Sequence, residues 1–359
     1  MGLTHGGDLT SASREFGVPK AQWIDLSTGI SPWSWPVPSV PEIVWQSLPD
    51  AGDGLEQEAV KYYGCDSSSV LAVSGSQEGL QKIPALIERG TVAIPVRGYE
   101  EHRLAWAKAG HEIVCYQDIG QLQQLVVTGQ VKHAVVINPN NPTSEIVDCQ
   151  QLTNIQRQLQ EKGGWLLVDE AFMDMVPENS LVQECPKSGL VVLRSIGKFF
   201  GLAGLRLGFV IAPRELLRQL AAQLPPWNVS HPARWIGKQA LVDTAWHKMQ
   251  RQRLSFASDE WFRLLQKYFP MLQLSCSPLF VSGTGGIDSC EMIYGQLAQQ
   301  GILVRLFDEI AGQSMVRFGL PKEDDMPKLN GVLAQVSRGL LFEKPTVCEK
   351  SREQLCTVG

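Results

Sequence analysis

Two cations lie in a segment of the chain that is otherwise suited to burial. Residues 194–209 read RSIGKFFGLAGLRLGF, which places Lys198 and Arg206 among small and apolar residues. An ammonium group with little water around it has a lowered pKa, and its free amine can form an imine. Arg206 stays charged and could grip a phosphate with its guanidinium fork. The alternative is that both side chains reach the surface along their aliphatic stems.

Other polar residues stand at the ends of short apolar runs, where the ligands of parallel sheets bind. They are Ser76 and Gln77 after VLAVSG, Asn141 in NPNNPT, Asp169 after WLLV, and Ser195 after LVVLR. The turn at Ser76 either binds a phosphate through backbone N–H groups or is a tight turn capped by the serine. Asp169, at the end of a buried strand, needs a cation or strong donors, and the alternative is a structural role as a helix N-cap or in an ion pair. NPNNPT is either a proline-shaped turn or an amide that points into a site.

These groups match one cofactor. A phosphate cradle, a carboxylate, an amide and an imine-forming lysine are what pyridoxal 5′-phosphate requires of a protein. Neither VSGSQEGL nor GLAGLRLG contains G-x-G-x-x-G, so a nicotinamide dinucleotide is not favoured. The sequence therefore predicts a site for pyridoxal 5′-phosphate and no metal site.

The elements that must position these residues alternate between apolar runs and amphipathic stretches. The runs lie at 70–75, 91–96, 112–117, 133–139, 165–171, 190–196 and 205–212. This alternation predicts an α/β domain with a mainly parallel sheet. After Pro and Trp residues interrupt the pattern at 224–235, a long helical region and fewer strands predict a smaller α+β domain. We expect an N-terminal active-site segment (1–40), a large cofactor-binding domain (41–227), a small C-terminal domain (228–345) and a tail (346–359).

Composition limits the class of protein. The 359 residues are 44% hydrophobic and 19% charged, as in soluble globular proteins, and the net charge of −5 argues against nucleic acid or anionic membranes as partners. The eight cysteines include no C-x-x-C pair, which favours reduced thiols in a cytosolic protein. The stretch MGLTHGGDLTSASREFG has no basic segment followed by an apolar core, so it does not read as a signal peptide, and no 18-residue apolar run occurs. We expect a cytoplasmic protein.

Four motifs, NPNNPT, VDEAF, SIGKFFGLAGLRLG and VRFGLP, occur in this order. They resemble those of fold-type I pyridoxal-phosphate enzymes of the aminotransferase class I/II family, and the resemblance covers about residues 20 to 340. It implies the fold-type I transferase fold and a homodimer with active sites at the interface. It also implies that Lys198 is the catalytic residue that binds the cofactor covalently, that Asp169 pairs with the ring nitrogen, and that Asn141 bonds the ring oxygen.

The same resemblance implies roles for further residues. The cofactor phosphate would be held by Ser76, Gln77, Ser195 and Arg206. The substrate carboxylate would be bound by Arg317. An aromatic residue usually stacks on the ring just after the strand that ends AIPV. In PVRGYEEH the best candidate is Tyr99, although Arg97 competes for the position.

The N-terminal stretches HGGDLTSASREFGVP and WIDLSTGISPWSWPVP are similar to those of decarboxylases of cobalamin biosynthesis that act on a phosphorylated amino acid. On that likeness, His5, Gly6, Gly7, Thr28 and Gly29, together with Asn141, are candidates to bind the substrate. Without it, HGG would be a flexible end and LSTGISP a plain turn.

Two positions depart from the family pattern, and other functions stay open. Phe172 stands where many aminotransferases have a Tyr that donates to the ring oxygen, which is compatible with a decarboxylase, and Ser144 replaces the usual Gly after N-P-T. The alternative activity is an aminotransferase for histidinol phosphate or a related substrate, which breaks the α-carbon's bond to hydrogen instead of its bond to the carboxylate. A third possibility is a binding or scaffolding protein without chemistry, against which Lys198, Asp169 and Arg206 argue.

Overall fold

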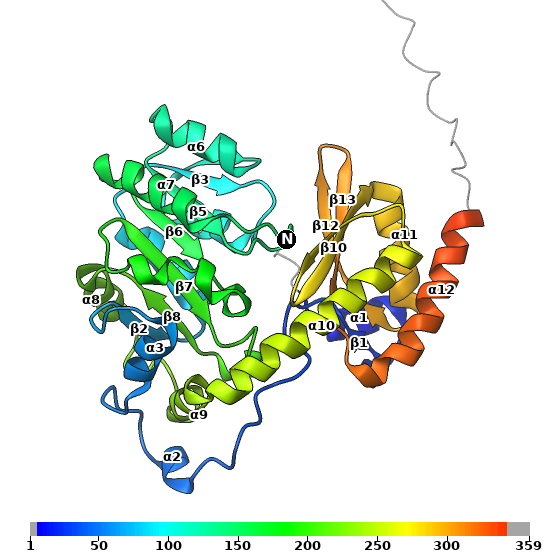
Figure 1. The fold of residues 1–359 in the computed structure, drawn as a ribbon, viewed down its shortest axis with the longest axis horizontal. Helices are drawn as coiled ribbons and strands as arrows, with labels where there is room; N and C mark the ends of the chain where they lie inside the picture. The colour runs from blue at the N-terminus through cyan, green and yellow to red at the C-terminus, as the bar shows by residue number, and fades with distance from the viewer. Residues whose placement is uncertain (1–5, 343–359) are drawn as a thin grey trace, which may run out of the picture.

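The computed structural model describes residues 6–342, which form two lobes joined by a long helix (Figure 1). The larger lobe is built on a seven-stranded sheet with the strand order β2-β8-β7-β6-β5-β3-β4. Its strands are β2 (Val70–Val73), β3 (Thr91–Pro95), β4 (Glu112–Tyr116), β5 (His133–Ile137), β6 (Leu166–Asp169), β7 (Leu190–Ser195) and β8 (Gly208–Ile211). The strands pair in parallel except for β8, which is antiparallel to both β2 and β7. The mainly parallel α/β fold expected from the sequence is confirmed.

Helices cover both faces of this sheet because its central strands carry apolar residues on alternate sides. Val136, Val168 and Val192 face a core that includes α3 (Leu55–Tyr63), α6 (Ile119–Val127), α7 (Cys149–Glu161) and α9 (His231–Val242). Their neighbours Val135, Leu167 and Val191 face a second core with α4 (Ser76–Lys82), α5 (Glu101–Lys108) and α8 (Arg214–Ala222). The strand ends are therefore held between two apolar layers.

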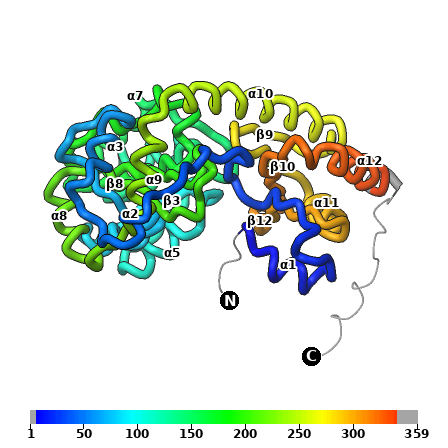
Figure 2. Tube along the Cα trace, turned by 90° about the horizontal axis from the view of Figure 1, so that it is seen from below, coloured from blue at the N-terminus to red at the C-terminus, as the bar shows by residue number. Residues whose placement is uncertain are grey.

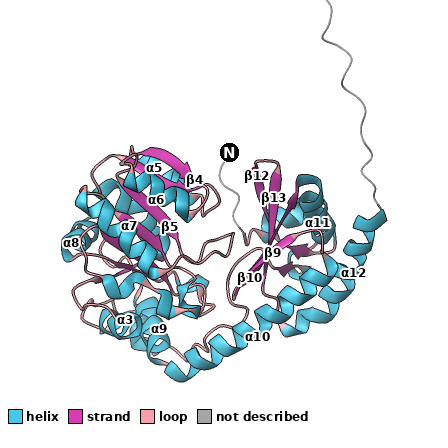
Figure 3. Cartoon of the chain, turned by 45° about the horizontal axis from the view of Figure 1, so that its top comes forward, coloured by secondary structure: helices cyan, strands magenta, loops and turns pink. Residues whose placement is uncertain are grey.

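The smaller lobe packs helices against a four-stranded antiparallel sheet with the order β12-β13-β10-β9. Its strands are β9 (Gln273–Ser277), β10 (Phe280–Gly286), β12 (Arg305–Ile310) and β13 (Gln313–Gly319), and its helices are α11 (Ile287–Gln299) and α12 (Met326–Phe342). Helix α10 (Thr244–Tyr268) runs from the larger lobe to the smaller one, as Figure 3 shows. None of the helices within residues 6–342 is long and apolar enough to span a membrane.

The beginning of the chain belongs to the smaller lobe. Helix α1 (Leu9–Phe16) lies there, and β1 (Ile24–Asp25) pairs in parallel with β11 (Ile302–Leu303). The chain then crosses to the larger lobe through an extended stretch before α2 (Glu42–Gln46), which Figure 2 shows in blue. Short 3-10 turns complete the described chain, at Lys20–Gln22, Ile83–Leu86, Met173–Met175, Pro177–Asn179, Leu181–Glu184, Ala203–Leu205 and Glu323–Asp325.

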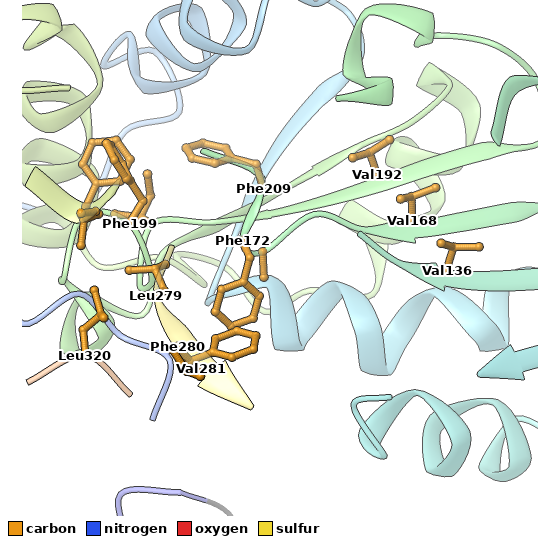
Figure 4. Close-up of a cluster of buried hydrophobic side chains, with 14 of the residues drawn as sticks. Val136, Val168, Phe172, Val192, Phe199, Phe209, Leu279, Phe280, Val281 and Leu320 are labelled. Carbon is orange, nitrogen blue, oxygen red and sulfur yellow. The ribbon is translucent and has the colours of Figure 1, made fainter. Parts of the chain in front are cut away.

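Aromatic packing joins the two lobes beside the ends of the strands. The Phe172 ring, three residues after β6, meets the Phe280 ring of β10 edge-on at 5.3 Å between centroids (Figure 4). Both rings are buried, and they belong to the same core as Val136, Val168 and Val192. The core of the larger lobe thus continues into the smaller one where the polar strand ends meet.

Candidate active site

Lys198 lies in the turn between β7 and β8, at the carboxyl end of the sheet. Its carbonyl accepts hydrogen bonds from the N–H groups of Ser31 and Gly201, at 3.0 and 3.1 Å, so the backbone of the turn is fixed. Burial, together with the nearby charge of Arg317, lowers the pKa of the ammonium to about 8 against the opposing effect of Asp169. Lys198 would thus give up its proton near neutral pH more readily than an exposed lysine.

Asp169 ends β6 and is held from two directions. Its Oδ2 lies 2.9 Å from His102 Nε2, and its Oδ1 accepts the Ala171 N–H at 3.1 Å. His102 is fully buried on α5, one helical turn after Tyr99, and the two rings meet edge-on at 6.3 Å. Sequence reasoning missed His102. The only feature of the sequence that could have indicated His102 as part of the site was its spacing of three residues from Tyr99.

The turn at Ser76 and the side chain of Arg206 form a cradle at the start of α4. A Cβ atom on Gly75 would lie 2.8 Å from Arg206 Nη2, and one on Gly208 would lie 2.3 Å from the Ser76 nitrogen. Glycine at both positions is therefore what lets the arginine and the neighbouring strand approach the turn. Ser195, whose Oγ accepts the Gly197 N–H at 3.2 Å, lines the same cavity.

These side chains surround one cavity of about 160 Å³. Its lining includes Ser76, Gln77, Tyr99, Asn141, Asp169, Phe172, Ser195, Lys198 and Arg206. The structure thus brings together all the residues that the sequence proposed for the cofactor. Phe172 supplies an apolar wall, with its ring centre 5.4 Å from Lys198 Nζ.

The structure places the two candidates for the ring-stacking position differently. Tyr99 lines the 160 Å³ cavity, and its hydroxyl donates to Gln77 Oε1 at 3.1 Å. The Arg97 guanidinium instead donates to the carbonyls of Ile310 and Gln313 in the smaller lobe, at 3.2 and 3.3 Å. Tyr99 is therefore the candidate that the geometry favours.

A second cavity of about 490 Å³ adjoins the first and shares Tyr99, Asn141, Lys198 and Arg206 with it. Arg317, on β13, faces this space from the smaller lobe. Its Nη1 donates to Asn141 Oδ1, and its Nη2 donates to the Ser27 carbonyl at 2.5 Å. Burial and the nearby Arg305 lower the pKa of Arg317 to about 10, so the side chain stays charged at neutral pH.

The N-terminal candidates occupy one wall of this second cavity. Gly6, Thr28 and Gly29 line it, whereas the Gly7 N–H bonds to Ser27 Oγ at 2.7 Å. A Cβ on Gly29 would lie 2.9 Å from the Phe172 ring, so only glycine lets this loop pass the aromatic wall. His5 lies outside the described residues.

Two further features of the site, Arg305 and Arg194, were not predicted from the sequence. Arg305 lines the 490 Å³ cavity from β12, in a strand where neither spacing nor motif distinguished it. Arg194 is buried beneath the site, where its guanidinium bonds Glu170 at 2.8 Å and Asp174 at 2.6 Å. Because Glu170 follows Asp169 and Arg194 precedes Ser195, this ion pair joins the ends of β6 and β7 directly behind the cavity.

The substitution of Ser144 for glycine has a visible backbone consequence. Ser144 adopts φ 67°, a left-handed conformation in which glycine carries less strain. Its N–H donates to the Asn140 carbonyl at 2.8 Å and closes the turn that presents Asn141. The turn therefore keeps its shape with serine, at a cost in strain.

Known proteins resemble this chain in sequence and in fold. The family model described as aminotransferase class I and II matches residues 49–329. A threonine-phosphate decarboxylase from Pseudomonas aeruginosa is 42% identical over 90% of this chain and 94% of its own length. A histidinol-phosphate aminotransferase from Thermoanaerobacter is 26% identical over 77% of this chain and 81% of its own. The histidinol-phosphate aminotransferase of Sinorhizobium meliloti, solved with pyridoxal-5′-phosphate, superposes with a TM-score of 0.80 at 19% identity, covering 95% of this chain and 96% of that one.

Proposed function

Because this chain belongs to the aminotransferase class I and II family, we propose that it decarboxylates L-threonine O-3-phosphate with pyridoxal 5′-phosphate as its cofactor. The products are CO2 and an aminopropanol phosphate. Support comes from the relative named threonine-phosphate decarboxylase, which is more similar to this chain than the relative named histidinol-phosphate aminotransferase.

The residues of the 160 Å³ cavity fit pyridoxal phosphate by their chemistry. A lysine with a pKa near 8 suits covalent attachment, and the Asp169 carboxylate suits a protonated ring nitrogen. His102 holds this carboxylate in place from behind. We assign the phosphate to Arg206, Ser195 and the turn at Ser76, where two glycines permit close approach.

When bound, the cofactor supplies a sink for the electron pair that is released as a bond to the substrate's α-carbon breaks. We assign to Arg317 the binding and orientation of the substrate carboxylate, and to Asn141, which Arg317 contacts, a hydrogen bond to the ring oxygen. Phe172 excludes water beside Lys198. Lys198 Nζ then returns a proton to the α-carbon after CO2 has left.

One observation carries the choice of substrate: two arginines of the 490 Å³ cavity remain without a carboxylate partner among residues 6–342 once Arg206 is assigned to the cofactor phosphate and Arg97 to the carbonyls of Ile310 and Gln313. Arg103 in the same cavity is paired with Glu100, whereas Arg305 and Arg317 form no salt bridge with any residue among 6–342. Two free cations suit a substrate with two anionic groups, a carboxylate and a phosphate. Histidinol phosphate carries a phosphate but no carboxylate.

Incubation of the purified holoenzyme with threonine phosphate, with and without 2-oxoglutarate, tests this proposal. We expect CO2 release that does not depend on 2-oxoglutarate. If turnover strictly requires 2-oxoglutarate and forms glutamate, the protein is an aminotransferase instead. If no turnover of either kind occurs and added pyridoxal phosphate gives no bound absorption band, the scaffolding function is supported.

We also propose that the protein is a homodimer and that α2 contributes to the contact between copies. Ile43, Trp45 and Leu48 are 62, 65 and 64% exposed on and just after this short helix. Three large apolar side chains that are left in water at one place indicate an interaction surface. Sedimentation of the wild type and of Trp45→Glu tests it: we expect a dimer that dissociates in the variant, and a monomeric wild type would contradict it.

A further inference from the structure

Ser27 is buried, at 2% exposure, and its side chain joins two parts of the N-terminal segment. The hydroxyl donates to Asp25 Oδ1 at 2.5 Å and accepts the Gly7 N–H at 2.7 Å. The Ser27 N–H also donates to Asp25 Oδ1, at 2.9 Å. With its proton directed to the carboxylate, the hydroxyl oxygen is turned toward Gly7 as an acceptor.

The Ser27 carbonyl makes a second junction. It accepts a hydrogen bond from Arg317 Nη2 at 2.5 Å, and Gly6 packs against it so closely that a Cβ there would lie 2.3 Å from the oxygen. One residue therefore bonds Gly7 through its side chain while its backbone contacts both Gly6 and the arginine assigned to the substrate carboxylate.

Gly6 and Ser27 also form part of a partition between two cavities. Both residues, together with Arg305, Phe307 and Asp308, line the 490 Å³ substrate cavity and a neighbouring cavity of about 420 Å³. If Gly6 and Gly7 moved away from Ser27, the two spaces would become continuous beside Arg305. The shape of the substrate cavity at this end therefore depends on the contact between Gly6 and Ser27.

The surrounding backbone does not depend on the Ser27 hydroxyl. Leu26 is held by backbone bonds to Leu303 at 2.7 Å and to Gly319 at 2.6 Å. Helix α1 is attached separately, through the bond from Trp23 Nε1 to Ser13 Oγ at 3.1 Å. Loss of the hydroxyl would therefore free Gly6 and Gly7 while leaving Arg317 and α1 in place.

We propose that Ser27 is a specificity-determining positioning residue: its hydroxyl holds Gly6 and Gly7 as the wall of the substrate cavity beside Arg305, and this wall selects substrates that carry a phosphate. The proposal rests on the function proposed above. An amino acid without a phosphate is held at its carboxylate by Arg317 and does not need the wall. A phosphorylated amino acid fills the cavity toward Arg305. There the closed wall keeps the substrate phosphate and the Arg305 guanidinium out of bulk water, which strengthens the attraction between them.

The test compares Ser27→Ala with Ser11→Ala in the holoenzyme. Ser11 is the matched control. It lies four residues after Gly7, and its hydroxyl also donates to an aspartate, Asp8, at 2.7 Å, but Ser11 does not line the substrate cavity. For Ser27→Ala we expect kcat/KM for threonine phosphate to fall about tenfold through KM, as for a lost buried hydrogen bond. In Ser27→Ala, kcat/KM for threonine should stay unchanged. Ser11→Ala should have the wild-type kcat/KM for both substrates.

Hydrogen exchange of the Gly7 amide gives a second measurement that needs no turnover. We expect exchange to be about tenfold faster in Ser27→Ala than in the wild type or in Ser11→Ala. Unchanged exchange, an unchanged preference for the phosphorylated substrate, or an equal loss for both substrates would each overturn the role of Ser27. A wild type that releases no CO2 contradicts only the proposed function, since the exchange experiment still decides whether Ser27 holds the wall.

Discussion

The two sides of the active site are built in opposite ways. On the side of the larger lobe, Asp169 and Ser195 end adjacent parallel strands and Lys198 follows in the next turn. The facing side is formed by residues from both ends of the chain, which meet only through tertiary contacts. They are Gly6, Ser27, Arg305 and Arg317. The first side is arranged by the topology of one sheet, whereas the second is arranged by packing between segments that are distant in sequence.

The electrostatic character of the two sides differs as well. Burial brings the pKa of Lys198 to about 8, so this amine can give or take a proton near neutral pH. The pKa of Arg317 is lowered only to about 10, so this side chain keeps its charge. The sheet side is therefore suited to covalent and proton-transfer chemistry, and the facing side to holding anions. The predictions below test this division.

The largest effect is expected for Lys198→Ala. We predict that the variant no longer retains pyridoxal phosphate covalently and that kcat falls roughly 10²–10⁴-fold or more. Its thermal midpoint should not fall, since a poorly solvated ammonium is removed. Lys162→Ala is the control, because that Nζ bonds the Val126 carbonyl at 2.7 Å and lines neither the 160 Å³ nor the 490 Å³ cavity. Cofactor that stays covalently bound after dialysis of Lys198→Ala would show that another lysine is the attachment point.

A pair of arginine variants tests the separation of the two sides directly. We predict that Arg206→Ala weakens binding of pyridoxal phosphate roughly 10–100-fold, as for the loss of hydrogen bonds to a charged group. Arg317→Ala should raise KM for threonine phosphate by a similar factor while the cofactor stays bound. Titration of the apoenzyme with pyridoxal phosphate and steady-state kinetics measure the two effects. If both variants lose both properties equally, the two sides are not independent.

The smallest effect on activity is expected at the other end of the sheet, at His133, which begins β5. Trp165 N–H donates to its Nδ1 at 3.2 Å, and its Nε2 lies 2.9 Å from the Glu88 carbonyl, so the neutral ring satisfies both partners. Burial lowers its pKa to about 4, although the bond to the Glu88 carbonyl opposes this shift. The unfolded chain binds this proton below about pH 6.5 and the folded chain only near pH 4, so stability falls as the pH drops through this window.

We predict that His133→Gln reduces the difference in unfolding free energy between pH 7 and pH 5 by about 1–2 kcal/mol. Urea denaturation at the two pH values measures it, and kcat at pH 7 should stay close to that of the wild type. His231→Gln serves as the control, since that ring is only partly buried and contacts the Ser47 carbonyl. An equal change in both variants would show that the pH dependence does not arise at His133.

The contrast between the two sides also explains which residues of the site could be predicted from the sequence. The residues proposed for the cofactor follow apolar runs directly, and a parallel sheet brings the ends of its strands together. The structure gathers them around one cavity, and the family is the one that the motifs indicated. Arg305 lies within a strand of ordinary composition, and only the fold shows that it faces the 490 Å³ cavity without an ionic partner in the described part of the chain.

His102 and Ser27 were missed for the same physical reason. His102 acts through a contact with Asp169, which lies far from it in sequence, and nothing local distinguishes it from any other helical histidine. Ser27 stands beside the candidates Thr28 and Gly29, but its importance arises from Asp25, Gly7 and Arg317 meeting at one residue. Positions of this kind depend on tertiary contacts that periodicity and motif spacing do not carry.

The pairing of β1 with β11 has a consequence for the order in which the protein folds during synthesis. Strands β2 to β8 are all synthesised before residue 212, so the larger lobe can close its sheet early. The strand at Ile24, although made first, has no partner until Ile302 has been translated. The segment that carries Ser27 must therefore wait for its strand partner until most of the chain has been made.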